Sequence, residues 1–329
     1  MKKTVLAFAV AAAMGVPALA AADTTLYGRF HVSVDRTDDG AKTATEMQNR
    51  VSRIGIRGSE DLGGGLSGVF QLEMSMNPVQ SDEINGNRNS FVGLRGDFGQ
   101  ATLGRVDAPY ESVLGPVQVM GDTPLDVRSI ISAGTTLSPR FRAENSVNYV
   151  SPNFSGLQVM AQYGVGTAGK DNDDNSYSLG AQYRLGDIYA FAAYSKRNAK
   201  TGDDEATGVV AGGTYSIDDL RLGVVLERAE DATNSRNAWL VNARYNIGQA
   251  YLAATYAKAG DFDGTDTGAT QYGIGAGYNF SRRTGAYVAY GKVDNDNAGT
   301  RYSVDGISSG PAAPGGDQSI FSIGVHHNF

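Results

Sequence analysis

The stretch that decides the fold is the last one of the chain, Ser319-Ile320-Phe321-Ser322-Ile323-Gly324-Val325-His326-His327-Asn328-Phe329. Alternate positions are apolar, as at Phe321, Ile323 and Val325, and the stretch ends on the aromatic Phe329. Because successive side chains of a strand point to opposite faces, this pattern predicts one apolar face. A strand crosses a membrane only within a closed barrel, where every backbone polar group is paired. We therefore expect a transmembrane β-barrel whose closing strand carries Phe329 as an outer-membrane assembly signal.

The other end of the chain has the pattern of a secretory signal peptide. Lys2 and Lys3 form a positive region, an apolar core runs over residues 5–16, and Ala18-Leu19-Ala20 provides small residues for cleavage. The core is too short to span a bilayer, so an uncleaved anchor helix is the weaker alternative. We expect residues 1–20 to be the signal peptide and residues 21–329 to be the barrel domain.

Composition excludes several functions. The chain has no Cys, and its formal charge of −7 becomes −9 without Lys2 and Lys3, which argues against a nucleic-acid partner. Past residue 20 no apolar run reaches 18 residues, so no membrane helix is expected. The three histidines lack metal-ligand spacing. We expect no cofactor, no metal site and no catalytic residue, because no nucleophile and base stand at a suitable spacing.

The chain alternates between tight joints and long polar connections. Tight joints are predicted at residues 61–65, 97–100, 151–155, 186–187, 218–219, 248–249 and 281–284. Longer connections are predicted at residues 36–49, 77–88, 107–143, 167–175, 197–206, 229–236, 260–269 and 294–317. Seven tight joints imply eight hairpins, and short periplasmic turns with long extracellular loops are typical of bacterial outer-membrane barrels. The sequence therefore predicts an all-β fold, a 16-stranded antiparallel transmembrane β-barrel.

A repeated aromatic supports this count. Tyr183, Tyr215, Tyr245 and Tyr278 each come just before a tight joint, at intervals of 32, 30 and 33 residues. Aromatic residues gather where a barrel meets the lipid headgroups, so one such residue per hairpin is expected. A soluble β-sandwich is the alternative interpretation, but sandwiches do not alternate loop lengths so regularly.

Period-two alternation separates the lipid face from the interior. In the first strand Phe30 and Val34 point outward while Arg29 and His31 point inward, and similar alternation covers residues 53–57 and 70–75. Residues 188–195 and 286–291 are apolar on both faces and cannot be assigned. The predicted interior is polar, and sixteen strands are wide enough to enclose water. The pattern therefore favours a water-filled channel.

The segment 107–143 breaks the rhythm because it is long and carries apolar residues that an exposed loop does not need. Such a loop is usually functional, and folded into the lumen it would narrow the channel and bury these residues against the wall. The acidic residues expected at the resulting eyelet are Asp107, Glu111, Asp122 and Asp126. The basic residues expected to face them are Arg29, Arg53, Arg57 and Arg105. Opposed charges in a narrow waist favour hydrated polar solutes over apolar ones.

Five stretches carry a family resemblance: SRIGIRGSEDLGGGL at 52–66, VFQLE at 69–73, SFVGL at 90–94, FGQATLGR at 98–105 and NSVNYVSPNF at 145–154. The chain resembles the trimeric general porins of proteobacterial outer membranes over nearly its whole mature length. The resemblance implies a homotrimer with an inward-folded third loop and a basic eyelet cluster at Arg53, Arg57 and Arg105, with Arg29 beside it. It further implies contact with outer-membrane lipid, lipopolysaccharide and the barrel assembly machinery.

Two departures from the family pattern bear on ion preference. At the tip of the third loop the chain has Leu114-Gly115-Pro116-Val117 in place of a common Pro-Glu-Phe-Gly segment, and Asn148 stands where relatives often carry a basic residue. We expect a non-enzymatic outer-membrane porin for passive diffusion of ions and small hydrophilic solutes. A substrate-selective or anion-selective channel is the first alternative, and an adhesin or an enzyme built on a barrel is the second.

Overall fold

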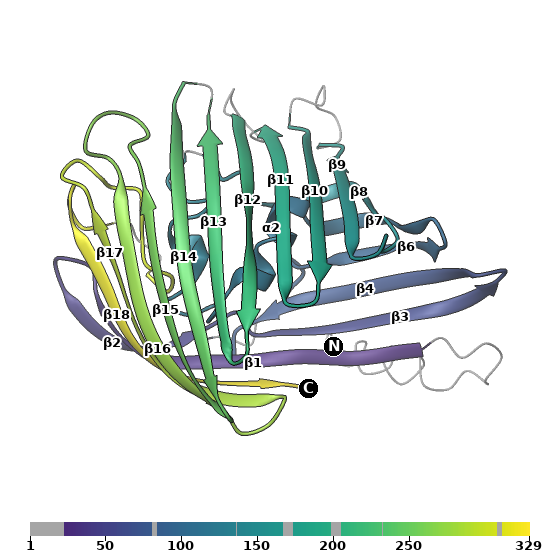
Figure 1. Cartoon of the computed structure of the whole chain (residues 1–329), viewed down its shortest axis with the longest axis horizontal. Helices are drawn as coiled ribbons and strands as arrows, with labels where there is room; N and C mark the ends of the chain where they lie inside the picture. The colour runs from purple at the N-terminus through teal and green to yellow at the C-terminus, as the bar shows by residue number, and fades with distance from the viewer. Residues whose placement is uncertain are drawn as a thin grey trace, which may run out of the picture.

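The computed structural model of the chain describes residues 23–80, 84–135, 137–166, 174–198, 205–231, 233–307 and 311–329. Within these residues the strands form one antiparallel sheet (Figure 1), and this sheet closes because the first strand pairs with the last. The expected barrel is therefore confirmed. No helix in the described ranges has the length and apolar character needed to cross a membrane. The predicted signal peptide lies outside the described residues and stays a prediction.

The strands follow one another around the barrel in chain order. They are β1 (Asp23–Asp38), β2 (Thr43–Asn49), β3 (Arg53–Gly63), β4 (Leu66–Met76), β5 (Ile84–Asn85), β6 (Ser90–Gly96), β7 (Gly99–Asp107), β8 (Arg142–Val150), β9 (Leu157–Gly164), β10 (Ser176–Leu185), β11 (Ile188–Asn198), β12 (Glu205–Ile217), β13 (Leu220–Glu230), β14 (Ser235–Ile247), β15 (Ala250–Ala259), β16 (Ala269–Asn279), β17 (Thr284–Asn295) and β18 (Asp317–Asn328). The short helices α2 (Pro109–Ser112), η1 (Gly115–Val117) and η2 (Val127–Ser129) lie between β7 and β8.

Two of the sixteen barrel strands are each interrupted once. β2 and β3 pair with successive halves of β1, and β5 and β6 pair with successive parts of β4. Each of these pairs is therefore one strand of the barrel, which gives the predicted total of sixteen. The first interruption lies at residues 50–52, where Val51 adopts a positive φ of 60°.

The connections alternate in length as expected. Tight turns join the strands at residues 64–65, 97–98, 151–156, 186–187, 218–219, 248–249 and 280–283. The predicted loop at residues 36–49 is wrong, because β1 and β2 continue through it and leave only residues 39–42 between them. The parts of β1 and β2 that lie in this predicted loop consist almost entirely of polar residues. They therefore lack the alternation of apolar and polar residues that predicts a strand from sequence.

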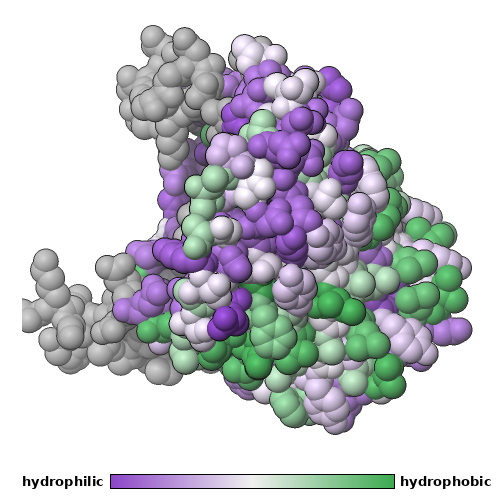
Figure 2. Space-filling model, turned by 90° about the vertical axis from the view of Figure 1, so that its left-hand side faces the viewer, coloured by the Kyte–Doolittle hydropathy of each residue, from purple (hydrophilic) through white to green (hydrophobic). Residues whose placement is uncertain are grey.

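Side chains alternate between an apolar outer face and a mostly polar inner face. Phe30 and Val34 are 40% and 48% exposed on the outside of β1, whereas His31 and Ser33 are buried inside. Figure 2 shows apolar side chains gathered on the lower part of one face of the molecule and hydrophilic ones on the upper part. An apolar outer band is what lipid requires of a barrel wall.

The two stretches that the sequence left unassigned are explained by what covers their inner face. In β11 Tyr189 and Phe191 point inward and belong to a buried apolar cluster, and in β17 Tyr287 does the same. Their partners are residues of the segment between β7 and β8. These strands are apolar on both faces because lipid covers one face and protein covers the other.

The barrel seam predicts a role for Phe329 in assembly. Its backbone N–H and C=O form a reciprocal pair of 3.1 Å hydrogen bonds with Gly28, and its ring lies 5.8 Å from the ring of Phe30. Deleting Phe329 removes these contacts where the sheet closes, each hydrogen bond being worth about 1 kcal/mol. We expect a much lower yield of folded barrel, measured as the heat-shifted band on an unheated gel. Phe280→Ala, which removes an exposed aromatic from a turn, is the control and should fold normally. Equal yields from the two variants would show that Phe329 is dispensable.

Candidate functional site

Residues 108–141, here called the inward loop, leave the wall after β7 and return to it at β8. The base of the loop is closed by a hydrogen bond from the Ala108 N–H to the Phe141 carbonyl at 3.0 Å. Pro109 begins α2, which suits a position whose N–H would have no helical partner. At η2 the Asp126 side chain accepts the N–H of Arg128 at 2.8 Å and caps the turn. Short helical turns, of which η2 is capped by a side chain, thus keep a long loop compact.

Apolar burial holds the inward loop inside the barrel. Its aliphatic side chains that are 0% exposed include Val113, Val117, Leu125, Val127, Ile130 and Ile131. Leu125 packs in one cluster with wall residues such as Tyr287, and the other five pack in a second cluster with Phe191 and Leu240 of the wall. Full burial of one such side chain contributes roughly 1.5–3 kcal/mol. The inward fold expected for the third loop is therefore what the structure shows.

A buried ion pair fixes the middle of the inward loop to the wall. Arg236 on β14 and Glu227 on β13 are both fully buried and lie 2.8 Å apart. The carboxylate accepts hydrogen bonds from the Tyr110 hydroxyl and from the Ser132 N–H, the latter at 2.8 Å. Arg236 donates to the Ile130 carbonyl at 3.1 Å. A buried ion pair is tolerated when the other hydrogen-bonding groups of its two side chains also have partners. Here backbone groups of the inward loop provide several of these partners.

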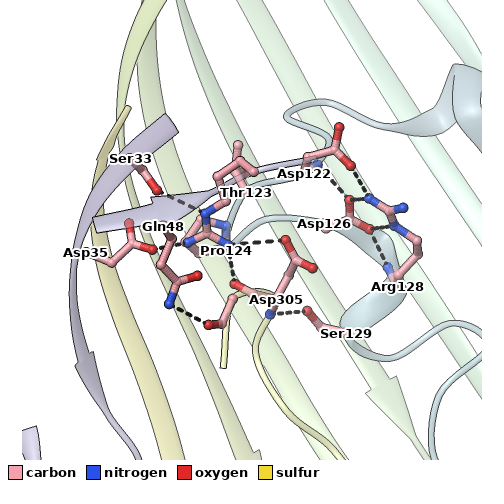
Figure 3. A network of polar contacts seen from close by, with 12 residues as sticks. Ser33, Asp35, Gln48, Asp122, Thr123, Pro124, Asp126, Arg128, Ser129 and Asp305 are labelled. Carbon is pink, nitrogen blue, oxygen red and sulfur yellow. Dashed lines mark hydrogen bonds and ion pairs between the residues drawn. The ribbon is translucent and has the colours of Figure 1, made fainter. Parts of the chain in front are cut away.

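A second set of contacts reaches the inward loop from residues 302–307, and Figure 3 shows it from close by. Asp305 donates its N–H to the Ser129 hydroxyl at 3.1 Å, and its carbonyl accepts a hydrogen bond from Arg50 at 2.9 Å. Arg50 also pairs with the buried Asp35 at 2.5 Å. Burial, reinforced by the negative charge of Asp126, raises the pKa of Asp305 to about 7. Residues 302–307 thus connect the barrel wall to the inward loop by hydrogen bonds to both.

The sequence missed this role of residues 302–307, which were expected to lie in an exposed polar loop. Tyr302 and Val304 are 0% exposed and join the same apolar cluster as the inward loop. The available signal was the apolar pair itself, placed at alternate positions in a polar stretch.

A cavity of about 680 Å³ opens between the inward loop and the wall opposite it. Nine charged side chains line the opening: Arg29, Arg53, Arg88, Arg128, Arg140, Arg142, Asp107, Glu111 and Asp122. Arg29 and Arg53 come from β1 and β3, whereas most of the others come from the inward loop or its two ends. The opening is therefore strongly charged, with six arginines against three carboxylates.

Ion pairs set the charge at this opening. Asp122 bridges the gap, because it pairs with Arg29 of the wall at 3.1 Å and with Arg128 of the loop at 2.6 Å. Arg140 pairs with Glu111 at 3.3 Å. Burial raises the pKa of Glu111, although both neighbouring arginines oppose that shift. Burial alone would also raise the pKa of Asp126, but the charge and hydrogen bonds of Arg128 outweigh it and lower that pKa.

A further carboxylate lies behind the wall arginines. Glu73 on β4 is 6% exposed, pairs directly with Arg88, and lies 3.8 Å from Arg53. It also accepts the Tyr27 hydroxyl at 3.0 Å. Glu73 and Glu227 are not paired with one another, because each has its own arginine on a separate part of the wall.

Two arginines expected at the eyelet lie elsewhere. Arg57 places its guanidinium 5.0 Å from the centre of the Tyr27 ring and lines a separate cavity of about 490 Å³. It shares the inner face with Arg53 but lies four residues, or roughly 13 Å, further along the strand. Arg105 pairs with Glu144 at 3.2 Å, outside the opening. The pairing of β7 with β8 shifts register between Gly104 and Val106, at the position of Arg105, and Gly104 has a φ of 144°.

The remaining predicted residues have mixed positions. Arg29 and Arg53 line the opening together with Asp107, Glu111 and Asp122, whereas Asp126 is fully buried beneath Arg128. Sequence reasoning missed four charged lining residues: Arg88, Arg128, Arg140 and Arg142. Three of these arginines lie in or directly after the inward loop, so the basic residues near its end were the available signal.

A closed sixteen-strand barrel with a polar lumen, an apolar outer band and a charged inward loop defines a membrane channel of the outer-membrane type. Comparison with known proteins agrees. A family model described as Gram-negative porin matches residues 7–298. The chain is 32% identical over 321 residues to the major outer membrane protein P.IB of Neisseria meningitidis serogroup B, serotype 15 (strain H44/76), covering 88% of this chain and 93% of that protein. The Neisseria lactamica protein of the same name is 30% identical with the same coverage.

Solved structures share the fold. The anion-selective porin from Comamonas acidovorans matches with a TM-score of 0.82 at 24% identity, over 94% of this chain and all of that one. OmpT of Vibrio cholerae in its trimer form matches with a TM-score of 0.72 at 19% identity and the same coverage. The chain therefore belongs to the Gram-negative porin family. It is a multi-pass outer-membrane β-barrel and a passive channel for ions and small hydrophilic solutes, not an enzyme.

The buried pair predicts a sharp stability effect. Glu227→Ala leaves the guanidinium of Arg236 buried without its partner, which should cost roughly 3–5 kcal/mol. We expect the folded barrel to lose its heat-shifted gel mobility at a clearly lower temperature than the unchanged protein. The control is Glu230→Ala on the same strand, because Glu230 forms an exposed pair with Arg228 and such pairs contribute about 1 kcal/mol or less. Equal thermal stability of the two variants would contradict the anchoring role of Glu227.

Proposed function

We propose that the opening lined by the nine charged residues is the eyelet of this porin, and that it weakly favours anions. The observation that carries this is the excess of arginine, six against three carboxylates at the lining. Counting the buried Glu73 and Asp126 behind them, six positive charges still exceed five negative ones. A small positive excess at the narrowest point attracts anions without excluding cations.

Local charge outweighs net charge in this setting. The whole chain carries −7, but a charge exposed to open water at physiological salt is screened over about 8 Å. Two unit charges 4 Å apart interact by about 1 kcal/mol in bulk water and by about 4 kcal/mol near a protein surface. An ion in the eyelet therefore responds mainly to the side chains that line it.

A matched pair of double variants tests this proposal. Arg29→Gln with Arg53→Gln removes two positive charges from the eyelet, and Arg57→Gln with Arg105→Gln removes two from outside it. We expect the first variant to shift the reversal potential in a KCl gradient towards cations. A loss of about 1 kcal/mol of attraction corresponds to a roughly five-fold change in the permeability ratio. The second variant should change it little.

An equal shift in both double variants would mean that selectivity follows total charge, and the eyelet assignment would fail. No shift in the first variant would show that Arg29 and Arg53 only support the wall. Migration of unheated protein on a gel shows that each variant has folded before its currents are compared.

We further propose that the protein is a homotrimer. OmpT of Vibrio cholerae has a trimer form, and close packing of barrel walls is helped by small outer residues. Gly68 and Gly96 lie on the outer face of β4 and β6, on the same side as the exposed Phe70 and Leu94. Gly93, between the exposed Val92 and Leu94, lies on the inner face.

The homotrimer predicts the behaviour of unheated detergent extracts. They should migrate on a gel far above the 34.6 kDa of the chain and collapse to monomer on boiling. Cross-linking before electrophoresis should give three species and no larger one. Extracts that migrate as monomer without heating, at every detergent concentration, would contradict this assignment.

The finer partner set follows from the family alone and is proposed on that basis. The outer band would contact outer-membrane lipid, the long-loop end would meet lipopolysaccharide, and the barrel assembly machinery would insert the chain. Residues 1–20 would be removed during secretion.

A further inference from the structure

Two arginines lie directly opposite one another on the inner wall, below the inward loop. Arg221 of β13 pairs in register with Arg244 of β14. Their neighbours Leu222 and Tyr245 are 43% and 48% exposed on the lipid side, so alternation places both arginines on the lumen side. Both lie close to the tight turns at residues 218–219 and 248–249, which puts them on the periplasmic side of the loop.

This pair has no carboxylate partner among the residues that the structure describes. Arg221 donates to the Gln118 carbonyl at 2.6 Å, and its Nε is buried without a hydrogen bond. Arg244 donates to the Val119 carbonyl at 3.1 Å and to the Asn246 side chain at 3.1 Å. Its guanidinium also lies 3.5 Å from the centre of the Tyr251 ring. Both side chains are therefore held in place while their charges stay uncompensated.

Like charges at directly opposed positions of a sheet destabilise it, so such a pair needs an explanation. The same two strands show the usual solution, because Arg236 of β14 has Glu227 of β13 as its partner. Eight residues further along the same inner face, Arg244 meets a second arginine instead. A negative charge supplied from solution would remove the repulsion here.

We propose that Arg221 and Arg244 together form a second anion site, which binds a small oxyanion such as phosphate or a carboxylate. Each guanidinium has five N–H donors. The hydrogen bonds above use one on Arg221 and two on Arg244. The planar fork of arginine matches two oxygens of a carboxylate or phosphate group, and two forks on adjacent strands can share one anion.

The site is separate from the eyelet, because neither arginine lines the opening. Gln118 connects the two, since it lines the opening and its carbonyl holds Arg221. An anion that leaves the eyelet towards the periplasm would therefore meet this pair next. The inference goes beyond the eyelet preference and does not depend on it, because the Arg29 and Arg53 variants test that preference separately.

The test is inhibition of chloride current by inorganic phosphate, measured on single trimers in planar bilayers with phosphate added to either side. The unchanged protein should show a saturable reduction of the current. Arg221→Gln with Arg244→Gln should raise the concentration for half-inhibition by roughly ten-fold or more, because charge-assisted hydrogen bonds are lost. Arg221→Lys with Arg244→Lys keeps the charges but loses the fork, and should give an intermediate value.

The matched control is Arg282→Gln with Arg283→Gln, which removes two charges from the exposed turn between β16 and β17. It should leave half-inhibition unchanged. The same measurement is repeated with acetate in place of phosphate. If the double glutamine variant of Arg221 and Arg244 loses inhibition by only one of the two anions, the site prefers that anion. Inhibition that is the same in this variant as in the unchanged protein, for both anions, would overturn the proposal. Absence of any saturable effect in the unchanged protein would overturn it as well.

Discussion

Docking of the inward loop onto the barrel wall is the constraint on which the rest of the structure depends. The barrel by itself would enclose a wide lumen. Apolar residues of the loop cover inward-facing Tyr189 and Phe191, and the buried Glu227 and Arg236 hold the loop backbone. Wall and loop are therefore complementary: much of the inner face is apolar where the loop lies, and the polar wall side chains there bind loop backbone. This explains why strands that face lipid on one side are apolar on both.

The charged opening follows from that docking. The apolar side of the loop faces the wall, so its charged residues remain on the side that faces the lumen. Asp122 then lies between Arg29 of the wall and Arg128 of the loop, and arginine remains in excess at the lining. An acidic protein thus presents an opening with a local excess of positive charge, and a passing ion responds to nearby charges more than to distant screened ones.

The sequence predicted the architecture well because barrel strands and tight turns have periodic signals. Strand number, turn positions and the inward loop all follow from alternation and loop length. The residues that line the charged opening were predicted less well, since strand periodicity tells which face of the wall a side chain lies on but not its position along the barrel axis. Arg53 and Arg57 share one face, yet Arg53 alone of the two reaches the opening. The bulge at Gly104 and the path of the loop that carries Arg128 and Arg140 depend on packing between distant segments, which no local pattern shows.

The most direct test of the account is chemical modification of the inward loop. The chain has no cysteine, so Gly115→Cys introduces a single thiol at a residue that lines the opening and has free space around it. A negatively charged thiol reagent should reduce the single-channel current in discrete steps and shift selectivity towards cations. Gly86→Cys, also in open space but outside the opening, should change neither after modification. Full labelling of the Gly115→Cys variant with unchanged current and selectivity would show that the inward loop is not the constriction.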